Sequence, residues 1–292
     1  MTSIARPDAA AGPPSTVTGA GGVRLAFQAW GDPGGHPVLF LHGGGQTRHA
    51  WGGTAAALAD RGCYAVSADL RGHGDSDWAP DGDYSLEAFA GDAAALAGAL
   101  HRPPTIVGAS MGGLAALLAQ GEITPPPASS LVLVDIATRM DPGAVLRIVS
   151  FMTAFPDGFA SLDEAADAVA AYQPHRERPS ELSGLRKNLR RGDDGRWRWH
   201  WDPAFMTGSQ RPAATGDAGR LNRAAAAVQV PTLLVRGRLS DMVSEEAVEE
   251  FLSHVPHAET VDVSGASHMV AGDRNDAFTS AVADFVLRHS VG

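Results

Sequence analysis

A serine between glycines is the first candidate for chemistry in this sequence. Residues 108–113 read Gly-Ala-Ser-Met-Gly-Gly, between an apolar run that ends at Val107 and an Ala/Leu-rich stretch. With 34 glycines in the chain such a motif arises readily by chance, so its flanks decide its meaning. A sharp strand-to-helix turn holds a serine hydroxyl clear of the backbone and beside a helix N-terminus that stabilises an oxyanion. This pattern predicts that Ser110 is a nucleophile for acyl transfer.

A glycine-rich loop upstream is the candidate for the rest of an oxyanion hole. The apolar run 38–41 continues into His-Gly-Gly-Gly-Gln at residues 42–46. Glycines let backbone N–H groups come close to a ligand, and the loop follows the carboxyl end of a predicted strand, where α/β sheets bind ligands. We expect the N–H groups of Gly44 and Met111 to be the two donors, with Gly43 and Gly45 as alternatives to Gly44.

The base and the orienting acid should follow the nucleophile along the chain. Among the 11 histidines, His268 alone combines a late position with a place just after a predicted strand. Asp241 follows another late strand in the same way and is the predicted acid. Asp135, directly after the strand that ends at Val134, is its rival, because it could reach the same histidine from the neighbouring strand.

The elements around these residues alternate between strands and helices, which favours an α/β fold with a mostly parallel central sheet flanked by helices. The predicted strands are 23–30, 38–41, 64–68, 105–107, 131–134, 232–235 and 260–263. The predicted helices are 51–60, 85–101, 111–120, 244–254 and 273–288. Continuous apolar runs in the middle strands indicate burial on both faces.

The alternation stops between residues 137 and 227, which predicts an inserted helical cap. Residues 17–136 and 228–292 then form the core, and residues 1–16 a flexible N-terminal tail. The cap carries several aromatic and methionine side chains, which either line a pocket for an apolar or aromatic group or attach the cap to the core. The candidates for substrate binding are Trp199, Phe151, Phe155 and Met206. Cap arginines such as Arg147 either bind a substrate carboxylate or are solvated.

Taken together, the chain resembles the α/β-hydrolase fold superfamily, in its serine-nucleophile branch with a helical cap, from about Val17 onward. The matching pieces are residues 42–45, residues 69–76, residues 108–112, Asp241 and His268. This resemblance implies a Ser110, His268 and Asp241 triad, and a mainly structural role for the loop 69–76. Haloalkane dehalogenases and epoxide hydrolases of this fold need an aspartate at the elbow, so the serine points to esterases, lactonases, perhydrolases and C–C bond hydrolases.

Composition excludes several other functions. The chain has 33 acidic and 23 basic residues, a net charge of −10, and no basic stripe, which disfavours nucleic acid as a partner. No apolar run is long enough to cross a bilayer and no signal peptide is evident, so we expect a cytoplasmic protein without a membrane partner. We expect ester or lactone hydrolysis of a small molecule without metal or organic cofactor. C–C bond hydrolysis, perhydrolysis and low-turnover ligand binding are the alternatives, and the oligomeric state is open.

Overall fold

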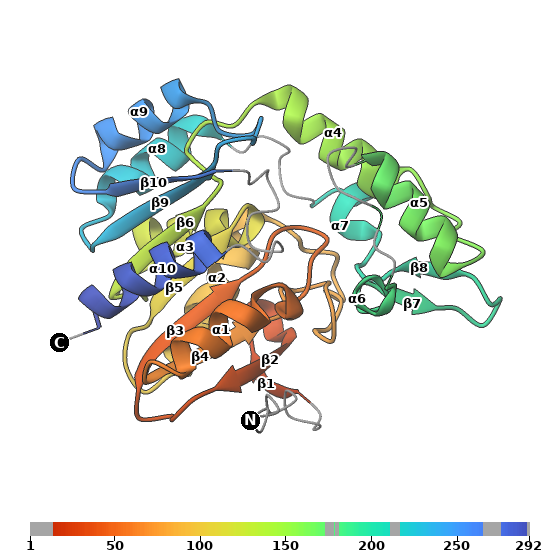
Figure 1. The fold of residues 1–292 in the computed structure, drawn as a ribbon, viewed down its shortest axis with the longest axis horizontal. Coiled ribbons are helices and arrows are strands. Elements are labelled where there is room, and N and C mark those ends of the chain that lie inside the picture. The colour runs from red at the N-terminus through yellow and green to blue at the C-terminus, as the bar shows by residue number, and fades with distance from the viewer. Residues whose placement is uncertain (1–13, 173–177, 179–180, 211–216, 265–275, 291–292) are drawn as a thin grey trace, which may run out of the picture.

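The computed structural model describes residues 14–172, 178, 181–210, 217–264 and 276–290. Within them, the main sheet has eight strands in the order β1-β2-β4-β3-β5-β6-β9-β10 (Figure 1). Their bounds are β1 Ser15–Thr18, β2 Arg24–Trp30, β3 His36–Leu41, β4 Cys63–Ala68, β5 Thr105–Ala109, β6 Ser130–Val134, β9 Thr232–Gly237 and β10 Glu259–Val263. The pairs β1–β2 and β2–β4 are antiparallel, and all later pairs are parallel.

The central strands form where the sequence is continuously apolar. Every residue of β3, β5 and β6 is buried, as expected for strands covered by helices on both faces. Strand β1 was not predicted from the sequence, because its residues are mostly exposed and carry no long apolar run. Ser15 and Thr16, expected in a flexible tail, pair with Phe27 and Ala26 of β2, whereas residues 1–13 lie outside the described part of the chain.

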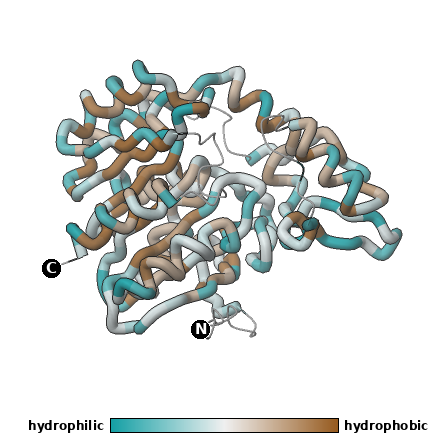
Figure 2. The backbone as a smooth tube through the Cα atoms, viewed as in Figure 1, coloured by the Kyte–Doolittle hydropathy of each residue, from teal (hydrophilic) through white to brown (hydrophobic). Residues whose placement is uncertain are grey.

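Helices cover both faces of the sheet. One layer contains α1 Gly52–Ala59 and α10 Asp276–Arg288, and the other contains α2 Leu86–Gly98, α3 Met111–Glu122, α8 Ala218–Ala227 and α9 Glu245–His254. Side-chain caps begin several of them: Ser85 accepts a hydrogen bond from the Ala88 N–H, and Ser244 from the Ala247 N–H. Figure 2 shows apolar residues concentrated along the strands and the helices that cover them. None of the described helices is both long and apolar enough to span a bilayer.

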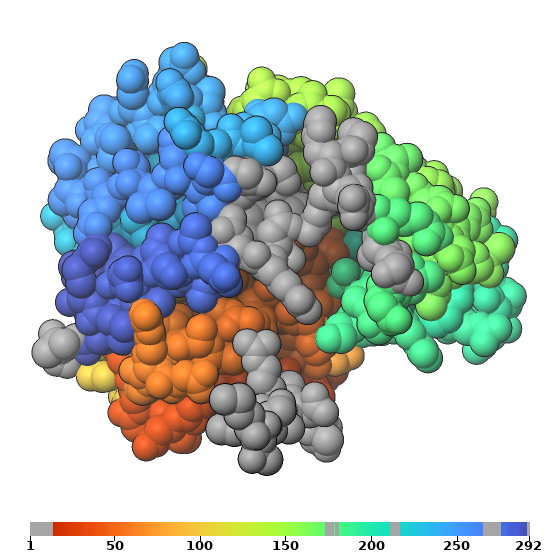
Figure 3. All heavy atoms as spheres, in the orientation of Figure 1, coloured from red at the N-terminus to blue at the C-terminus, as the bar shows by residue number. Residues whose placement is uncertain are grey.

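The chain between β6 and α8, where a cap is predicted, forms a lobe beside the core (Figures 1 and 3). Its elements are α4 Pro142–Thr153, α5 Leu162–Tyr172, α6 Ser183–Arg186, β7 Leu189–Arg191, β8 Trp197–Trp199 and α7 Ala204–Thr207. The cap is not purely helical, because β7 and β8 pair as an antiparallel hairpin.

The cap also ends earlier than the predicted boundary at residue 227. Helix α8 lies inside that boundary, yet Leu221, Ala224 and Ala225 are buried in the same apolar cluster as α3. The two helices approach closely, since a Cβ at Gly121 would lie 2.4 Å from the carbonyl oxygen of Ala224. The small residues on both helices therefore place α8 in the helical layer of the core.

Candidate active site

Ser110 lies in a strained turn between β5 and α3. Its φ of 46° and ψ of −115° are rarely adopted by residues other than glycine. Its N–H donates to the carbonyl of Val134 at 3.2 Å, and Gly108 must lack a side chain because a Cβ there would lie 2.5 Å from the Gly112 carbonyl oxygen. Ser110 is partly exposed, whereas most of α3 is buried. The turn thus has the geometry that presents a serine hydroxyl to a substrate.

The glycine-rich loop lies directly beside this turn. A Cβ built on Gly43 would be 3.3 Å from the Ser110 Cβ. The Gly43 N–H donates to Gln46 Oε1 at 2.9 Å and the Gly45 N–H to His73 Nε2 at 3.1 Å. Among the described residues the Gly44 N–H has no acceptor, so it is the donor of the three that remains available to an oxyanion. The Met111 N–H, in the first turn of α3, has no acceptor within its helix.

Asp135 is the carboxylate that the sheet brings next to the elbow. Ala109 pairs with Val134 in the parallel register, so Ser110 and Asp135 follow side by side beyond the strand ends. Asp135 is 1% exposed and has a φ of 49°. Its Oδ1 accepts the Gly237 N–H at 3.3 Å, and its Oδ2 accepts the Ser240 hydroxyl. The carboxylate is therefore fixed from the β9 side of the site.

Asp241, the predicted acid, is placed differently. Its side chain is 61% exposed and forms an ion pair with Arg147 of α4, which is 58% exposed. The structure thus directs the Asp241 carboxylate to the boundary between core and cap. His268 lies outside the described residues. Strand β10, which ends at Val263, is parallel to β9, so its C-terminal end is at the same edge of the sheet as that of β5.

Three buried histidines surround the glycine-rich loop, and their ring nitrogens have defined roles. His42 Nε2 accepts the Leu70 N–H at 3.0 Å, and His42 Nδ1–H donates to the Gly43 carbonyl at 2.8 Å. Burial lowers the pKa of His42 to about 4 and that of His73 to about 3. Burial also holds the pKa of His200 well below its usual value. All three imidazoles are therefore neutral at physiological pH. Sequence patterns could not reveal this cluster, because His200 comes from the cap and reaches Gly74 and Gly45 across more than 100 positions.

The predicted substrate-binding aromatic residues form one connected group in the cap. The ring centroids of Phe151 and Trp199 lie 5.8 Å apart, and those of Phe151 and Phe155 6.5 Å apart. Stacked neighbours extend the group, with Trp201 on Trp199 at 4.9 Å and Tyr172 on Phe151 at 4.2 Å. Met206, on α7, packs against the main apolar cluster, as Trp199 also does.

Comparison with known proteins identifies the family. A sequence model of the alpha/beta hydrolase family matches residues 38–281. The chain belongs to the alpha/beta hydrolase family. The predicted superfamily and fold class are thereby confirmed.

Two relatives and one solved structure illustrate the likeness. Esterase Rv0045c of Mycobacterium tuberculosis is 32% identical over 260 residues, which are 84% of this chain and 80% of that protein. The 3-hydroxybutyrate-oligomer hydrolase of Cupriavidus necator is 30% identical over 267 residues, which are 86% of this chain and 89% of that protein. The crystal structure of E-2-(acetamidomethylene)succinate hydrolase matches with a TM-score of 0.80, covering 94% of this chain and 98% of its own; at 24% identity it shows likeness of fold.

In this alpha/beta hydrolase the loop 69–76 is held by buried ion pairs. Asp69 accepts the Arg48 N–H at 2.7 Å, pairs with the Arg48 guanidinium, and accepts the Asp75 N–H at 2.9 Å. Arg71 donates two hydrogen bonds to Asp92, at 2.7 and 2.8 Å. Buried charged groups that are paired in this way are typical of a structural loop, which is the role that the resemblance implies.

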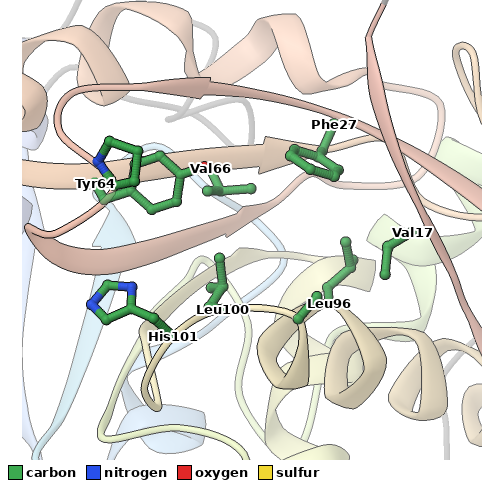
Figure 4. Close-up of a pocket in the computed structure, with 9 residues that line it drawn as sticks. Val17, Phe27, Tyr64, Val66, Leu96, Leu100 and His101 are labelled. Carbon is green, nitrogen blue, oxygen red and sulfur yellow. The ribbon is translucent and has the colours of Figure 1, made fainter.

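A surface groove of about 240 Å³ lies elsewhere in the hydrolase (Figure 4). It is lined by Val17, Phe27, Pro33, Tyr64, Val66, Leu96, Ala99, Leu100 and His101. Tyr64 is near the start of β4, and His101 shortly precedes β5, whereas Ser110 follows the end of β5. The groove is therefore near the opposite edge of the parallel strands and contains none of the candidate catalytic residues.

Proposed function

We propose that this protein is a serine hydrolase that cleaves a carboxylic ester or lactone of a small apolar or aromatic substrate through an acyl-enzyme. The observation that carries the proposal is the strained, partly exposed Ser110 beside the glycine-rich loop, which approaches it at Gly43 and contains the available Gly44 N–H. Ester hydrolysis is supported by family membership and by relatives named as an esterase and an oligomer hydrolase, both at about 30% identity.

In the proposed mechanism, His268 takes the proton from the Ser110 hydroxyl as its oxygen attacks the acyl carbon. The N–H groups of Gly44 and Met111 hold the resulting oxyanion. The intermediate collapses, and His268 gives the proton to the departing alcohol. Water then attacks the acyl-enzyme with His268 as its base, which releases the acid and restores Ser110. The base must be neutral to act, so activity should fall below a pH of about 6.

We assign the role of orienting acid to Asp135 in preference to Asp241. An acid that fixes the tautomer of a histidine is effective when it is buried and rigidly held. Asp135 meets both conditions through its burial and through the hydrogen bonds from Gly237 and Ser240. The Asp241 carboxylate is solvated and is neutralised by Arg147.

The aromatic group of the cap supports the proposed substrate class. Trp201 is at one end of the group and lies against Gly45, because a Cβ built on Gly45 would be 3.1 Å from the Trp201 ring. Trp199 and Phe151 continue from Trp201 as partly exposed aromatic surface. Such surface suits an apolar or aromatic acyl or alcohol group.

The proposal is tested by labelling and turnover in parallel. The wild-type protein, Ser110→Ala and a surface control, Ser253→Ala, are treated with a fluorophosphonate and assayed with p-nitrophenyl acetate, a δ-lactone and a 3-hydroxybutyrate dimer. We expect labelling and turnover in the wild type and the control, and neither in Ser110→Ala. Ester cleavage that survives in Ser110→Ala would overturn the proposal.

Two further assays address the alternative functions. A β-diketone tests C–C bond hydrolysis, and peracid formation from acetate and hydrogen peroxide tests perhydrolysis. If the turnover rate in either assay exceeds the rate with every ester tested, that reaction is the activity of the protein and the proposed ester hydrolysis is wrong. Stoichiometric labelling without any turnover would instead indicate a binding protein that has kept the fold.

A further inference from the structure

His200 is a cap residue that is buried between two loops of the core. It is 2% exposed. Its Nδ1 accepts the Gly74 N–H at 2.7 Å, so the ring proton is on Nε2, which donates to the Gly45 carbonyl at 3.3 Å. One imidazole thus connects the cap to the structural loop 69–76 and to the glycine-rich loop.

The other backbone group of Gly45 is held by a second imidazole. The Gly45 N–H donates to His73 Nε2 at 3.1 Å, and His73 Nδ1–H donates to the Arg71 carbonyl at 2.9 Å. Gly45 has a φ of 77°, a conformation that few other residues adopt. Gly45, the residue after Gly44, is therefore held through its N–H by the core and through its carbonyl by the cap.

Apolar side chains of the cap cover the same loop. A Cβ built on Gly45 would lie 3.1 Å from both Met152 and Trp201, and one built on Gly44 would lie 3.3 Å from Phe205. All three side chains are buried. The glycine-rich loop is thus packed beneath the cap, so its conformation depends on how the cap is seated.

The segment that carries His200 is anchored independently. The Asp202 N–H donates to the Gly72 carbonyl at 2.9 Å, and the Tyr84 hydroxyl donates to Asp202 Oδ2 at 2.6 Å. These bonds do not involve the His200 ring, so we expect them to hold the cap segment when that ring is replaced. Substitutions at His200 can therefore change the loop while the cap stays attached.

We propose that His200 is a positioning residue through which the cap fixes the oxyanion hole. The inference rests on the proposed role of the Gly44 N–H as an oxyanion donor. A displacement of catalytic groups by about 1 Å costs on the order of 100-fold in rate. Loss of the His200 hydrogen bond should therefore lower kcat and leave KM nearly unchanged, because the oxyanion exists only in the transition state.

Two variants separate the hydrogen bonds of His200 from its volume. His200→Phe fills the space and makes neither bond, whereas His200→Gln keeps a donor near the position of Nε2. His257→Gln is the matched control, because His257 also bonds a backbone carbonyl through Nε2, that of Val230 at 3.0 Å, but on the exposed surface of the core. Each variant is assayed for kcat, KM, Tm and inhibition by phenylboronic acid, which forms a tetrahedral adduct with an active serine.

We expect His200→Phe to lower kcat by about 10- to 100-fold with a change in KM below about 3-fold. Its boronic acid inhibition constant should rise in proportion, and His200→Gln should recover part of both losses. Full activity of His200→Phe, or a loss explained by a lower Tm alone, would overturn the inference. Ser110→Ala separates a failure of the proposed function from a failure of this inference. If activity survives in Ser110→Ala, the proposed function is wrong. If activity requires Ser110 but does not change in the His200 variants, only the inference about His200 is wrong.

Discussion

Ser110 and Asp135 occupy matching positions, each one residue beyond the end of its strand, on the adjacent parallel strands β5 and β6. Both have positive φ angles, 46° and 49°. Among the described residues no other non-glycine residue has a positive φ. Backbone strain of this kind persists only where the surroundings impose it, and it gathers at functional sites. The shared strain at neighbouring positions supports a catalytic role for both residues.

Asp135→Asn should lower kcat by about 10⁴-fold, because an amide favours the wrong histidine tautomer. Asp241→Asn should change kcat by less than about 3-fold, since its partner is the exposed Arg147 and surface ion pairs contribute little. Steady-state kinetics on one ester compare the two variants. The reverse ranking would return the role of acid to Asp241.

Ser110→Gly should abolish turnover and yet stabilise the fold relative to Ser110→Ala. Glycine adopts positive φ without a steric penalty, whereas alanine keeps the strain of the elbow. A gain of about 1 kcal/mol in the free energy of unfolding is expected, measured by urea denaturation of both variants. Equal stability of the two variants would show that the turn carries no strain.

The buried histidines should make the fold sensitive to acid. In the unfolded chain His42 and His73 titrate near 6.5, but in the fold their pKa values lie at about 4 and about 3, chiefly because of burial. Between the folded and unfolded pKa values, the unfolded state binds protons that the folded state does not. The contribution of the two neutral histidines to the free energy of unfolding is therefore complete above pH 6.5, and it is lost as the pH falls toward 4 for His42 and toward 3 for His73.

His73→Gln isolates this effect, because its amide oxygen can still accept the Gly45 N–H. The free energy of unfolding is measured by urea denaturation from pH 4 to pH 7. Between pH 4 and 6 the wild type should lose about 1.4 kcal/mol per pH unit more than the variant does. Parallel curves for the two proteins would contradict the assignment of a neutral, buried His73.

Asp92→Ala should destabilise the fold by about 3–5 kcal/mol, because it leaves the buried Arg71 guanidinium without its carboxylate. Asp284→Ala is the matched control, since its pair with Arg61 is exposed on both sides, and it should cost less than about 0.5 kcal/mol. Urea midpoints measure both changes. A small effect of Asp92→Ala would mean that water reaches and solvates Arg71.

The sequence predicted those parts of the fold and of the site that depend on local patterns. Continuous apolar runs located the buried strands. The glycines around Ser110 reflect close backbone approaches, and Gly44 and Gly45 leave room for cap side chains. The edge strand β1 and the hairpin of β7 and β8 were missed, because their mixed polar composition resembles that of a loop.

Long-range features of the site could not be predicted in this way. Asp135 and Asp241 both follow apolar strands, and only the packing of the loop after β9 decides which carboxylate is buried. His200 is separated from Gly45 by 155 positions, and no spacing rule connects them. Such contacts depend on how the cap is seated on the core.

The hydrogen bonds that hold Gly45 from both the core and the cap have a consequence for protein engineering. The cap cannot be treated as a module that is exchanged between relatives at its two junctions with the sheet. A transplanted cap would have to bring its own equivalents of His200, Trp201 and Phe205, matched to the recipient's loops at 43–45 and 69–76. Chimeras that exchange these loops together with the cap should keep their turnover, whereas those that exchange the cap alone should fold and react slowly.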